Sequence, residues 1–183
     1  MKQLNRWVYA IVGVIVLLFA GLVYAWSVLS TPIAAEFTGW TKAQLSLTFT
    51  LVMILFCIGS LLCGLLAGKL SAKNAVRVSA VLFLAGFFIA SRCQSPITLY
   101  LGFGLLCGLA SGLAYNGVMS TMVKWFPDKP GLISGVLLMG FGGGSFLIGK
   151  LYQAWTPAGI GGWRTSFVVL GIICCVVLAV CSF

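Results

Sequence analysis

The sequence lacks histidine and has almost no acidic residues. Of 183 residues, only Glu36 and Asp128 are acidic, and charged residues make up 7% of the chain. A soluble domain carries about a quarter charged residues, so this chain has too few charges to cover a surface that faces water. With 61% hydrophobic residues, the composition predicts a membrane protein.

The same absences exclude most catalytic chemistry. A Ser-His-Asp triad, a histidine-bound metal and a histidine general base all need the residue that the chain lacks. A hydrolase with paired carboxylates would have only Glu36 and Asp128 to use. We therefore expect no enzyme activity, no catalytic residue, no metal site and no cofactor.

The cysteines and basic residues have simple interpretations. Seven cysteines lie in apolar runs without C-x-x-C spacing, which favours small buried side chains over a disulfide framework or a metal site. The 11 basic residues stand singly between apolar runs. Membrane topology explains that placement better than nucleic-acid binding, so we expect contact with membrane lipid and no nucleic-acid partner.

Six apolar segments are long enough to cross a membrane, which takes about 20 residues. The predicted spans are residues 7–30, 44–68, 75–93, 97–123, 131–154 and 163–183. In the third, Arg77 and Arg92 flank the uncharged core and can reach the two interfaces. The first is about twice as long as the apolar run of a signal peptide and lacks a small-residue cleavage site. The predicted fold class is an all-α membrane protein with six transmembrane helices.

The basic residues also predict the orientation. With the N-terminus inside, seven of them fall on the inner side and four on the outer side, which agrees with the positive-inside rule. Six spans return the C-terminus to the inner side. We expect a multi-pass protein of the inner or plasma membrane, N-in and C-in. The outer basic residues are Lys42, Arg92, Lys150 and Arg164, and the inner ones are Lys2, Arg6, Lys69, Lys73, Arg77, Lys124 and Lys129.

Small residues recur four positions apart in several spans, and this spacing lets membrane helices pack closely. The sets are Gly104, Gly108 and Gly112; Gly140 and Gly144; Ser60, Gly64 and Gly68; and Gly131 and Gly135. Packing is the simpler interpretation. The alternative is that residues 140–144 mark a helix that bends in a moving bundle, since glycine lowers helix stability.

A short internal similarity links the first and fourth spans. Gly21-Leu22-Val23-Tyr24 and Gly112-Leu113-Ala114-Tyr115 place each tyrosine at about the same depth of its span. Because the two spans run in opposite directions, this is the pattern of an inverted three-plus-three repeat. The two hydroxyls would then lie on either side of a midplane site.

The segment 115–135, with Lys124-Trp125-Phe126-Pro127-Asp128-Lys129 at its centre, resembles the oxalate/formate antiporter family of the major facilitator superfamily. Residues 5–7 and 21–26 are similar to the first helix of that family. Residues 162–167, Gly-Trp-Arg-Thr-Ser-Phe, are similar to the start of helix six in the superfamily. The resemblance covers the whole chain but only the N-terminal half of a twelve-helix protein, and it implies one six-helix bundle built as a three-plus-three repeat.

The resemblance implies that Tyr24, Trp26 and Tyr115 face a central cavity, where they would bracket a small carboxylate. For each aromatic residue the alternative is a packing or interface position. Asn116 is costly inside a membrane unless it hydrogen-bonds a neighbour or a ligand. Val23 stands where the oxalate-type member has glutamine, which argues against oxalate itself. In the family, the cations that pair with the substrate lie on helices eight and eleven, which this chain does not include.

The two inner loops carry further expectations. Trp125 is placed as an interfacial anchor, Pro127 ends the fourth helix, and Asp128 is placed to cap the fifth. The loop between spans two and three resembles the superfamily gating loop at Gly64, Lys69 and Lys73. There, Gly68 replaces the aspartate that helps latch the two halves of such transporters, and Ser71 replaces a glycine.

Together these features predict the N-terminal half of a secondary transporter that moves small organic anions, mono- or dicarboxylates such as formate, lactate or oxalate, by alternating access. A second six-helix bundle, as a missing C-terminal half or a partner, would complete it, because the sequence stops as span six ends. The alternative is a stand-alone or degenerate six-helix subunit without transport activity of its own, favoured by the missing latch aspartate and cations. Proton coupling through a buried carboxylate or histidine has no candidate in this chain. A membrane enzyme and a selective channel both lack their residues.

Overall fold

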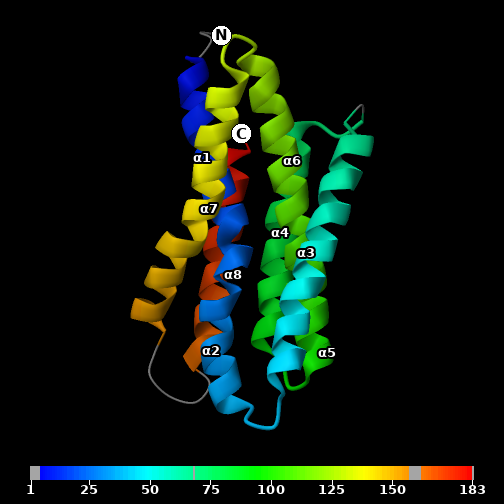
Figure 1. The fold of residues 1–183 in the computed structure, drawn as a ribbon, viewed down its shortest axis with the longest axis vertical. Helices are drawn as coiled ribbons and strands as arrows, with labels where there is room; N and C mark the ends of the chain where they lie inside the picture. The colour runs from blue at the N-terminus through cyan, green and yellow to red at the C-terminus, as the bar shows by residue number, and fades with distance from the viewer. Residues whose placement is uncertain (1–4, 68, 157–161, 183) are drawn as a thin grey trace.

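The computed structural model describes residues 5–67, 69–156 and 162–182, and these residues form helices and short loops without a strand. Figure 1 shows an elongated bundle with both chain ends at one pole. In chain order the elements are α1 (Arg6–Ala20), the 3-10 helix η1 (Gly21–Ala25), α2 (Trp26–Glu36), α3 (Lys42–Leu65), α4 (Ala72–Ser91), α5 (Pro96–Leu99), the π-helix η2 (Tyr100–Cys107), α6 (Gly108–Trp125), α7 (Pro130–Trp155) and α8 (Gly162–Cys181).

These elements make six helices long and apolar enough to cross a membrane, so the six predicted spans are confirmed. The first is the continuous helix Arg6–Glu36, and the fourth is Pro96–Trp125. The first span passes its predicted end at residue 30 because the helix continues through Pro32. The other spans lie within three residues of their predicted bounds, although residues 68 and 183 lie outside the described residues.

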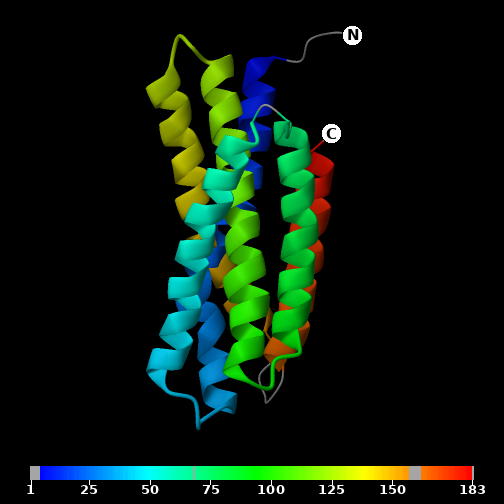
Figure 2. The same ribbon diagram turned by 90° about the vertical axis from the view of Figure 1, so that its right-hand side faces the viewer.

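The helices pair as an inverted repeat requires. The most extensive contacts join α1 to α7, α3 to α6, and α4 to α8. In such a repeat α1, α3 and α4 correspond to α6, α7 and α8. The α1–α7 pair then corresponds to the α6–α3 pair, and the α4–α8 pair corresponds to itself. Figure 2 shows α3 beside α6 and α4 beside α8.

Aromatic rings fill the centre of the side of the bundle formed by α4, η2 and α8. Phe87 contacts Phe103 edge-on with ring centroids 5.7 Å apart and Phe167 with centroids 5.6 Å apart, and all three side chains are fully buried. Trp163 stacks edge-on against Phe167 at 5.3 Å. Since lipid chains are as apolar as these rings, close packing rather than exclusion of water stabilises this core.

The glycine sets do not all pack. A Cβ on Gly108 would come within 2.8 Å of the Val52 carbonyl oxygen of α3, and one on Gly140 within 3.0 Å of the Val14 carbonyl oxygen of α1. A Cβ on Gly104 would lie 3.2 Å from the Leu51 side chain of α3. Gly108 and Gly140 therefore lie where two helix backbones meet, an approach that small residues at this spacing allow.

The first turns of α7 do not pack against another described helix, so packing at Gly131 and Gly135 stays a prediction. A Cβ on Gly131 or Gly135 would meet nothing within 4 Å, because both lie on a face of α7 that no described helix covers. The helix itself runs from Pro130 to Trp155 without a break, and bending at residues 140–144 stays a prediction. Figure 1 shows α7 following the bundle at the pole of the termini and diverging from it toward Trp155.

Candidate functional site

Two equivalent backbone contacts hold the centre of the bundle. A Cβ on Gly21 would overlap the carbonyl oxygen of Phe141 on α7, and one on Gly112 would overlap that of Phe56 on α3. Glycine is required at both positions because any larger residue would push the helices apart. The similarity between residues 21–24 and 112–115 therefore corresponds to the same contact made twice.

The reverse contacts repeat as well. A Cβ on Gly144 of α7 would overlap the carbonyl oxygen of Leu18, and one on Gly59 of α3 would collide with that of Leu109. Each pair of helices is thus joined by glycine contacts in both directions. In sequence this gives Leu-x-x-Gly-x-x-Tyr on spans one and four, against Phe-x-x-Gly on spans five and two.

Five aromatic side chains meet at these contacts. The Tyr24 ring lies edge-on to Phe141 with centroids 5.4 Å apart, and the Tyr115 ring lies 5.1 Å from the same phenylalanine. Phe56 is 5.4 Å from Tyr115 and 5.8 Å from Phe141, and Phe49 is 6.2 Å from Tyr24. We call these five residues the aromatic centre. It brings together the two tyrosines predicted from the sequence.

The tyrosines present hydroxyls at the middle of their spans. Tyr24 is 40% exposed although it lies deep in the first helix, and Tyr115 is half-buried. Neither hydroxyl is hydrogen-bonded to another residue that the structure describes, so both remain available to a ligand. Phe56 and Phe141 were not among the predicted site residues, but the repeated Phe-x-x-Gly of spans two and five could have identified them.

The other two predicted cavity residues are engaged in helix packing. The indole of Trp26 is buried and donates to the Leu45 carbonyl of α3 at 3.0 Å. The amide of Asn116 donates to the carbonyl oxygen of Ser60 at 2.9 Å and to its hydroxyl at 3.1 Å. The neighbour that Asn116 needs is therefore Ser60. A Cβ on Gly64, a predicted gating residue, would lie 3.7 Å from the same amide nitrogen, an ordinary van der Waals distance, so this contact does not require glycine.

A groove leads from the aromatic centre to the pole opposite the termini. It has a volume of about 630 Å³ and lies between η1–α2 and α3. Tyr24 and Phe49 lie at its deep end and Lys42, the first residue of α3, at its mouth. The rest of its lining consists of Trp26, Ser27, Ser30, Leu45, Ser46 and Thr50.

Ion pairs join the helices at both poles. At the pole of the termini, Arg6 binds Asp128 through two hydrogen bonds of 2.7 and 2.9 Å. This hydrogen bonding lowers the pKa of Asp128. The expected cap of the fifth helix is wrong: α7 begins at Pro130 after Lys129, with no side-chain cap, so Asp128 is too early in the sequence and reaches α1 instead.

The aromatic residues of the same loop dock beside this ion pair. Phe126 is fully buried, edge-on to Trp7 at 5.1 Å, with the Arg6 guanidinium 4.8 Å above its ring. Trp125 is 45% exposed and packs against Tyr9, which agrees with an interfacial anchor. The segment that resembles the antiporter family therefore fixes the fourth and fifth spans to the start of the first.

At the opposite pole, Glu36 closes the bundle. Its carboxylate accepts bonds of 2.6 and 2.9 Å from Arg164 and one of 2.7 Å from the indole of Trp163, which joins α2 to α8. The guanidinium lies 4.6 Å from the Trp163 ring. Both acidic residues of the chain are thus paired with arginine. Beside this cluster, burial raises the pKa of the Cys93 thiol to about 11.

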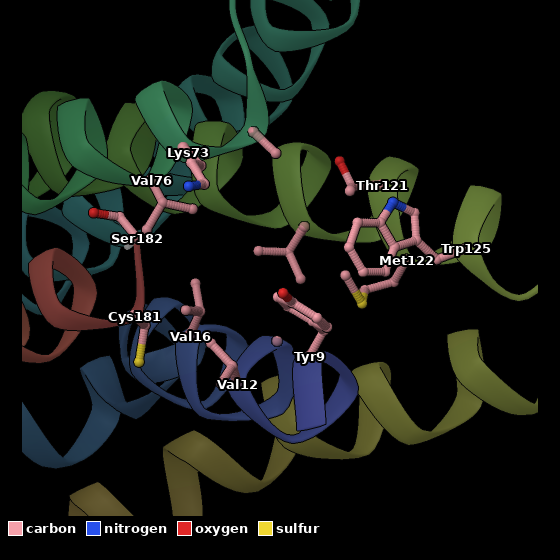
Figure 3. Close-up of a pocket in the computed structure, with 13 residues that line it drawn as sticks. Tyr9, Val12, Val16, Lys73, Val76, Thr121, Met122, Trp125, Cys181 and Ser182 are labelled. Carbon is pink, nitrogen blue, oxygen red and sulfur yellow. The ribbon is translucent and has the colours of Figure 1, made fainter. Parts of the chain in front are cut away.

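The predicted gating loop lies at the pole of the termini. Lys69 is exposed, and Lys73 lines a second pocket of about 250 Å³ between α1, α4, α6 and α8. Figure 3 shows Lys73 there near Ser182, with Tyr9 and Trp125 across the pocket. Ser71 caps α4 by accepting from the Asn74 amide, and Gly68 lies outside the described residues. Neither lysine has a carboxylate partner among the described residues, since both acidic residues bind arginines.

The described residues contain no cluster of three or more His, Cys, Asp or Glu side chains that could hold a metal ion. The hydroxyls and aromatic rings of the aromatic centre and the groove suit reversible binding of a small polar ligand between apolar walls.

Comparison with known proteins extends this result. The profile of the Major Facilitator Superfamily matches residues 11–183. An uncharacterised MFS-type transporter of Escherichia coli, YhjX, is 33% identical over 144 residues, covering 78% of this chain and 35% of that protein. The oxalate:formate antiporter of Oxalobacter formigenes is 28% identical, covering 75% of this chain and 33% of that protein. Monocarboxylate transporter 1 of Rattus norvegicus is 27% identical over 139 residues, covering 74% of this chain and 28% of that protein. The chain therefore spans less than half the length of each of these relatives.

Proposed function

The chain belongs to the Major Facilitator Superfamily, and from this premise we propose that it is the N-terminal half of a secondary transporter for small organic anions. The main support for this proposal is the aromatic centre, where Tyr24 and Tyr115 pack on one phenylalanine with hydroxyls free for a ligand.

The proposed substrates are small mono- or dicarboxylates such as formate, lactate or oxalate. Two relatives are named for transport of such anions, an oxalate:formate antiporter and a monocarboxylate transporter. Tyrosine hydroxyls suit a carboxylate because they donate hydrogen bonds to it without a fixed charge, and the apolar rings exclude larger polar solutes. Asn116 and Trp26 hold the helices that carry the site, and their place in the proposal is to position it.

The mechanism proposed is alternating access around this centre. The glycine contacts make α1–α7 and α3–α6 two close-packed pairs, which supports movement of this half as one rigid body against a second one. No lysine or arginine lies in the aromatic centre, so the charge that neutralises the substrate would come from the other half. A second six-helix bundle, covalently continuous or separate, is therefore the proposed partner.

The exposed surface of the bundle supports a partner. Tyr24 and the groove open between η1–α2 and α3, so a bundle placed there would close the cavity. With the N-terminus inside, as the charges predict, the groove opens to the outside.

The test is transport by the protein that contains this chain, reconstituted in lipid vesicles, with labelled lactate and formate. Tyr24→Phe and Tyr115→Phe each remove one hydroxyl and keep the ring, so we expect a higher KM with unchanged expression. Tyr9→Phe, the same change at the other pocket, is the matched control. Wild-type kinetics in both site variants would remove the two tyrosines from the site.

The alternative, a six-helix subunit without transport activity, makes a different prediction. The lysines of the gating loop without a carboxylate partner support it. Under this alternative, vesicles that contain the wild-type protein take up none of the labelled anions. The chain instead co-purifies with a stable partner protein, without transport of these anions.

A further inference from the structure

We propose that Lys42 and the hydroxyls that line the groove form an outer binding site where an anionic substrate is captured before it reaches the aromatic centre. This inference rests on the proposed function. It adds a cation within this half of the protein, and it assigns a role to the groove that the tyrosines alone do not explain.

The ammonium group of Lys42 lacks a protein counter-ion. The chain has two acidic residues, and the structure pairs Asp128 with Arg6 and Glu36 with Arg164. No hydrogen bond or ion pair joins Lys42 to another residue that the structure describes. A cation at the mouth of a cavity without a carboxylate partner is suited to an anion that enters from solution.

Hydroxyl-bearing side chains line the groove among its apolar ones, although the helices are membrane-spanning. On the first span, Tyr24 and Ser27 are exposed one helical turn apart, so they share one face. On α3, exposed Ser46 and Thr50 follow Lys42 at steps of four residues. Exposed polar side chains at this depth line water rather than lipid.

The polar face of α3 is separate from its apolar one. Leu47, Ile54 and Ile58 are 45%, 50% and 41% exposed on the neighbouring side of the helix, where they suit lipid. Hydroxyl groups therefore lie along the groove between Lys42 and Tyr24. Those of Ser30 and Thr50 donate to backbone carbonyls of their own helices, which leaves the hydroxyls of Ser27 and Ser46 to donate to an anion.

The position of Lys42 strengthens its attraction for anions. It is the first residue of α3, where the helix dipole is positive, and the capping box of Thr41 and Gln44 fixes this turn. A charge at the rim of a binding site acts mainly on the association rate and on its salt dependence. Loss of the Lys42 charge should therefore raise KM at low salt and leave kcat unchanged.

The experiment measures uptake of labelled lactate into right-side-out membrane vesicles that contain the whole transporter, at low and at high salt. In Lys42→Gln we expect KM to rise about 3- to 10-fold at low salt, with kcat unchanged and a weaker dependence of KM on salt. Lys42→Arg keeps the charge and should restore wild-type KM.

Lys150→Gln is the matched control. Lys150 is also exposed and also belongs to the basic residues predicted on the outer side of the membrane. Its ammonium group lies over the Phe146 ring, and it does not line the groove. The variant should retain the wild-type KM. The inference is overturned if Lys42→Gln keeps the wild-type KM and salt dependence, or if Lys150→Gln raises KM equally. If the wild type takes up no anion at all, the proposed function itself fails, and the inference fails with it.

Discussion

Alanine substitutions at the glycine contacts test the repeated architecture of the bundle most sharply. Gly112→Ala places a methyl group on the Phe56 carbonyl oxygen, and Gly21→Ala places one on that of Phe141. Gly143→Ala adds the same methyl group where nothing lies within 4 Å. The three variants are chemically identical and differ only in what the new methyl group meets.

The expected magnitudes follow from packing. To relieve the overlap at Gly112, α3 and α6 must separate by about 1 Å, and a gap of that size forfeits roughly a quarter to a half of the dispersion energy of the atoms in contact. Overpacked sites of this kind lose about 1–3 kcal/mol. Replacing an unpacked glycine in a helix gains up to about 1 kcal/mol. Gly112→Ala and Gly21→Ala should therefore be destabilised alike, and Gly143→Ala should be neutral or more stable.

The assay is thermal unfolding of the three variants and the wild type in the same detergent, followed by helical circular dichroism. Equal midpoints for Gly112→Ala and Gly143→Ala would refute the close approach of α3 and α6. A large loss at Gly112 with none at Gly21 would refute the equivalence of the two halves of the repeat.

Three further predictions concern the poles and the groove. Arg164→Ala leaves the partly buried carboxylate of Glu36 without its cation, and thermal unfolding should show a loss of about 1–3 kcal/mol, whereas an unchanged midpoint would show that the pair contributes nothing. Because Arg6 lowers the pKa of Asp128, their ion pair stabilises the fold at pH values above the usual carboxyl pKa, and this stabilisation is lost as pH falls below about 4. The unfolding midpoints of the wild type and Arg6→Gln should therefore converge at low pH. A difference between the two midpoints that stays constant with pH would contradict this. Cys57 is exposed two turns beyond Thr50 on the polar face of α3, so a water-soluble maleimide should label it, and lactate should slow the labelling. Labelling of a Cys57→Ser variant at the same rate would show that the reactive thiol is another cysteine.

The sequence predicted the fold well because apolar length alone identifies membrane spans. It also predicted that Tyr24 and Tyr115 belong together, since the small similarity around them reflects a shared contact. The packing partners Phe56 and Phe141 escaped prediction because their signal, Phe-x-x-Gly, specifies only two residues. It indicates a site only once the helices are seen to pair.

The errors have physical causes. Aspartate is a residue type that often caps helices, so the loop sequence suggested a cap at Asp128. Its proximity to Arg6 of the first helix is set by the fold and cannot be inferred from the loop sequence. For Asn116 the sequence left a neighbour and a ligand as alternatives, because membrane interiors disfavour unpaired amides; the neighbour is Ser60, 56 positions earlier, which the sequence could not identify. Similarly, the 3-10 segment at Gly21–Ala25 lies where the helix meets the Phe141 backbone, a contact between distant parts of the chain.

The central claim is that this bundle supplies a binding site for small carboxylates in a membrane transporter. The most direct measurement is uptake of labelled formate, lactate and oxalate by lipid vesicles containing the purified whole transporter, against vesicles without protein. We predict saturable uptake of at least one of these anions, competed by the unlabelled anion and reduced by Tyr115→Phe. Uptake no greater than in protein-free vesicles for all three anions would contradict the claim.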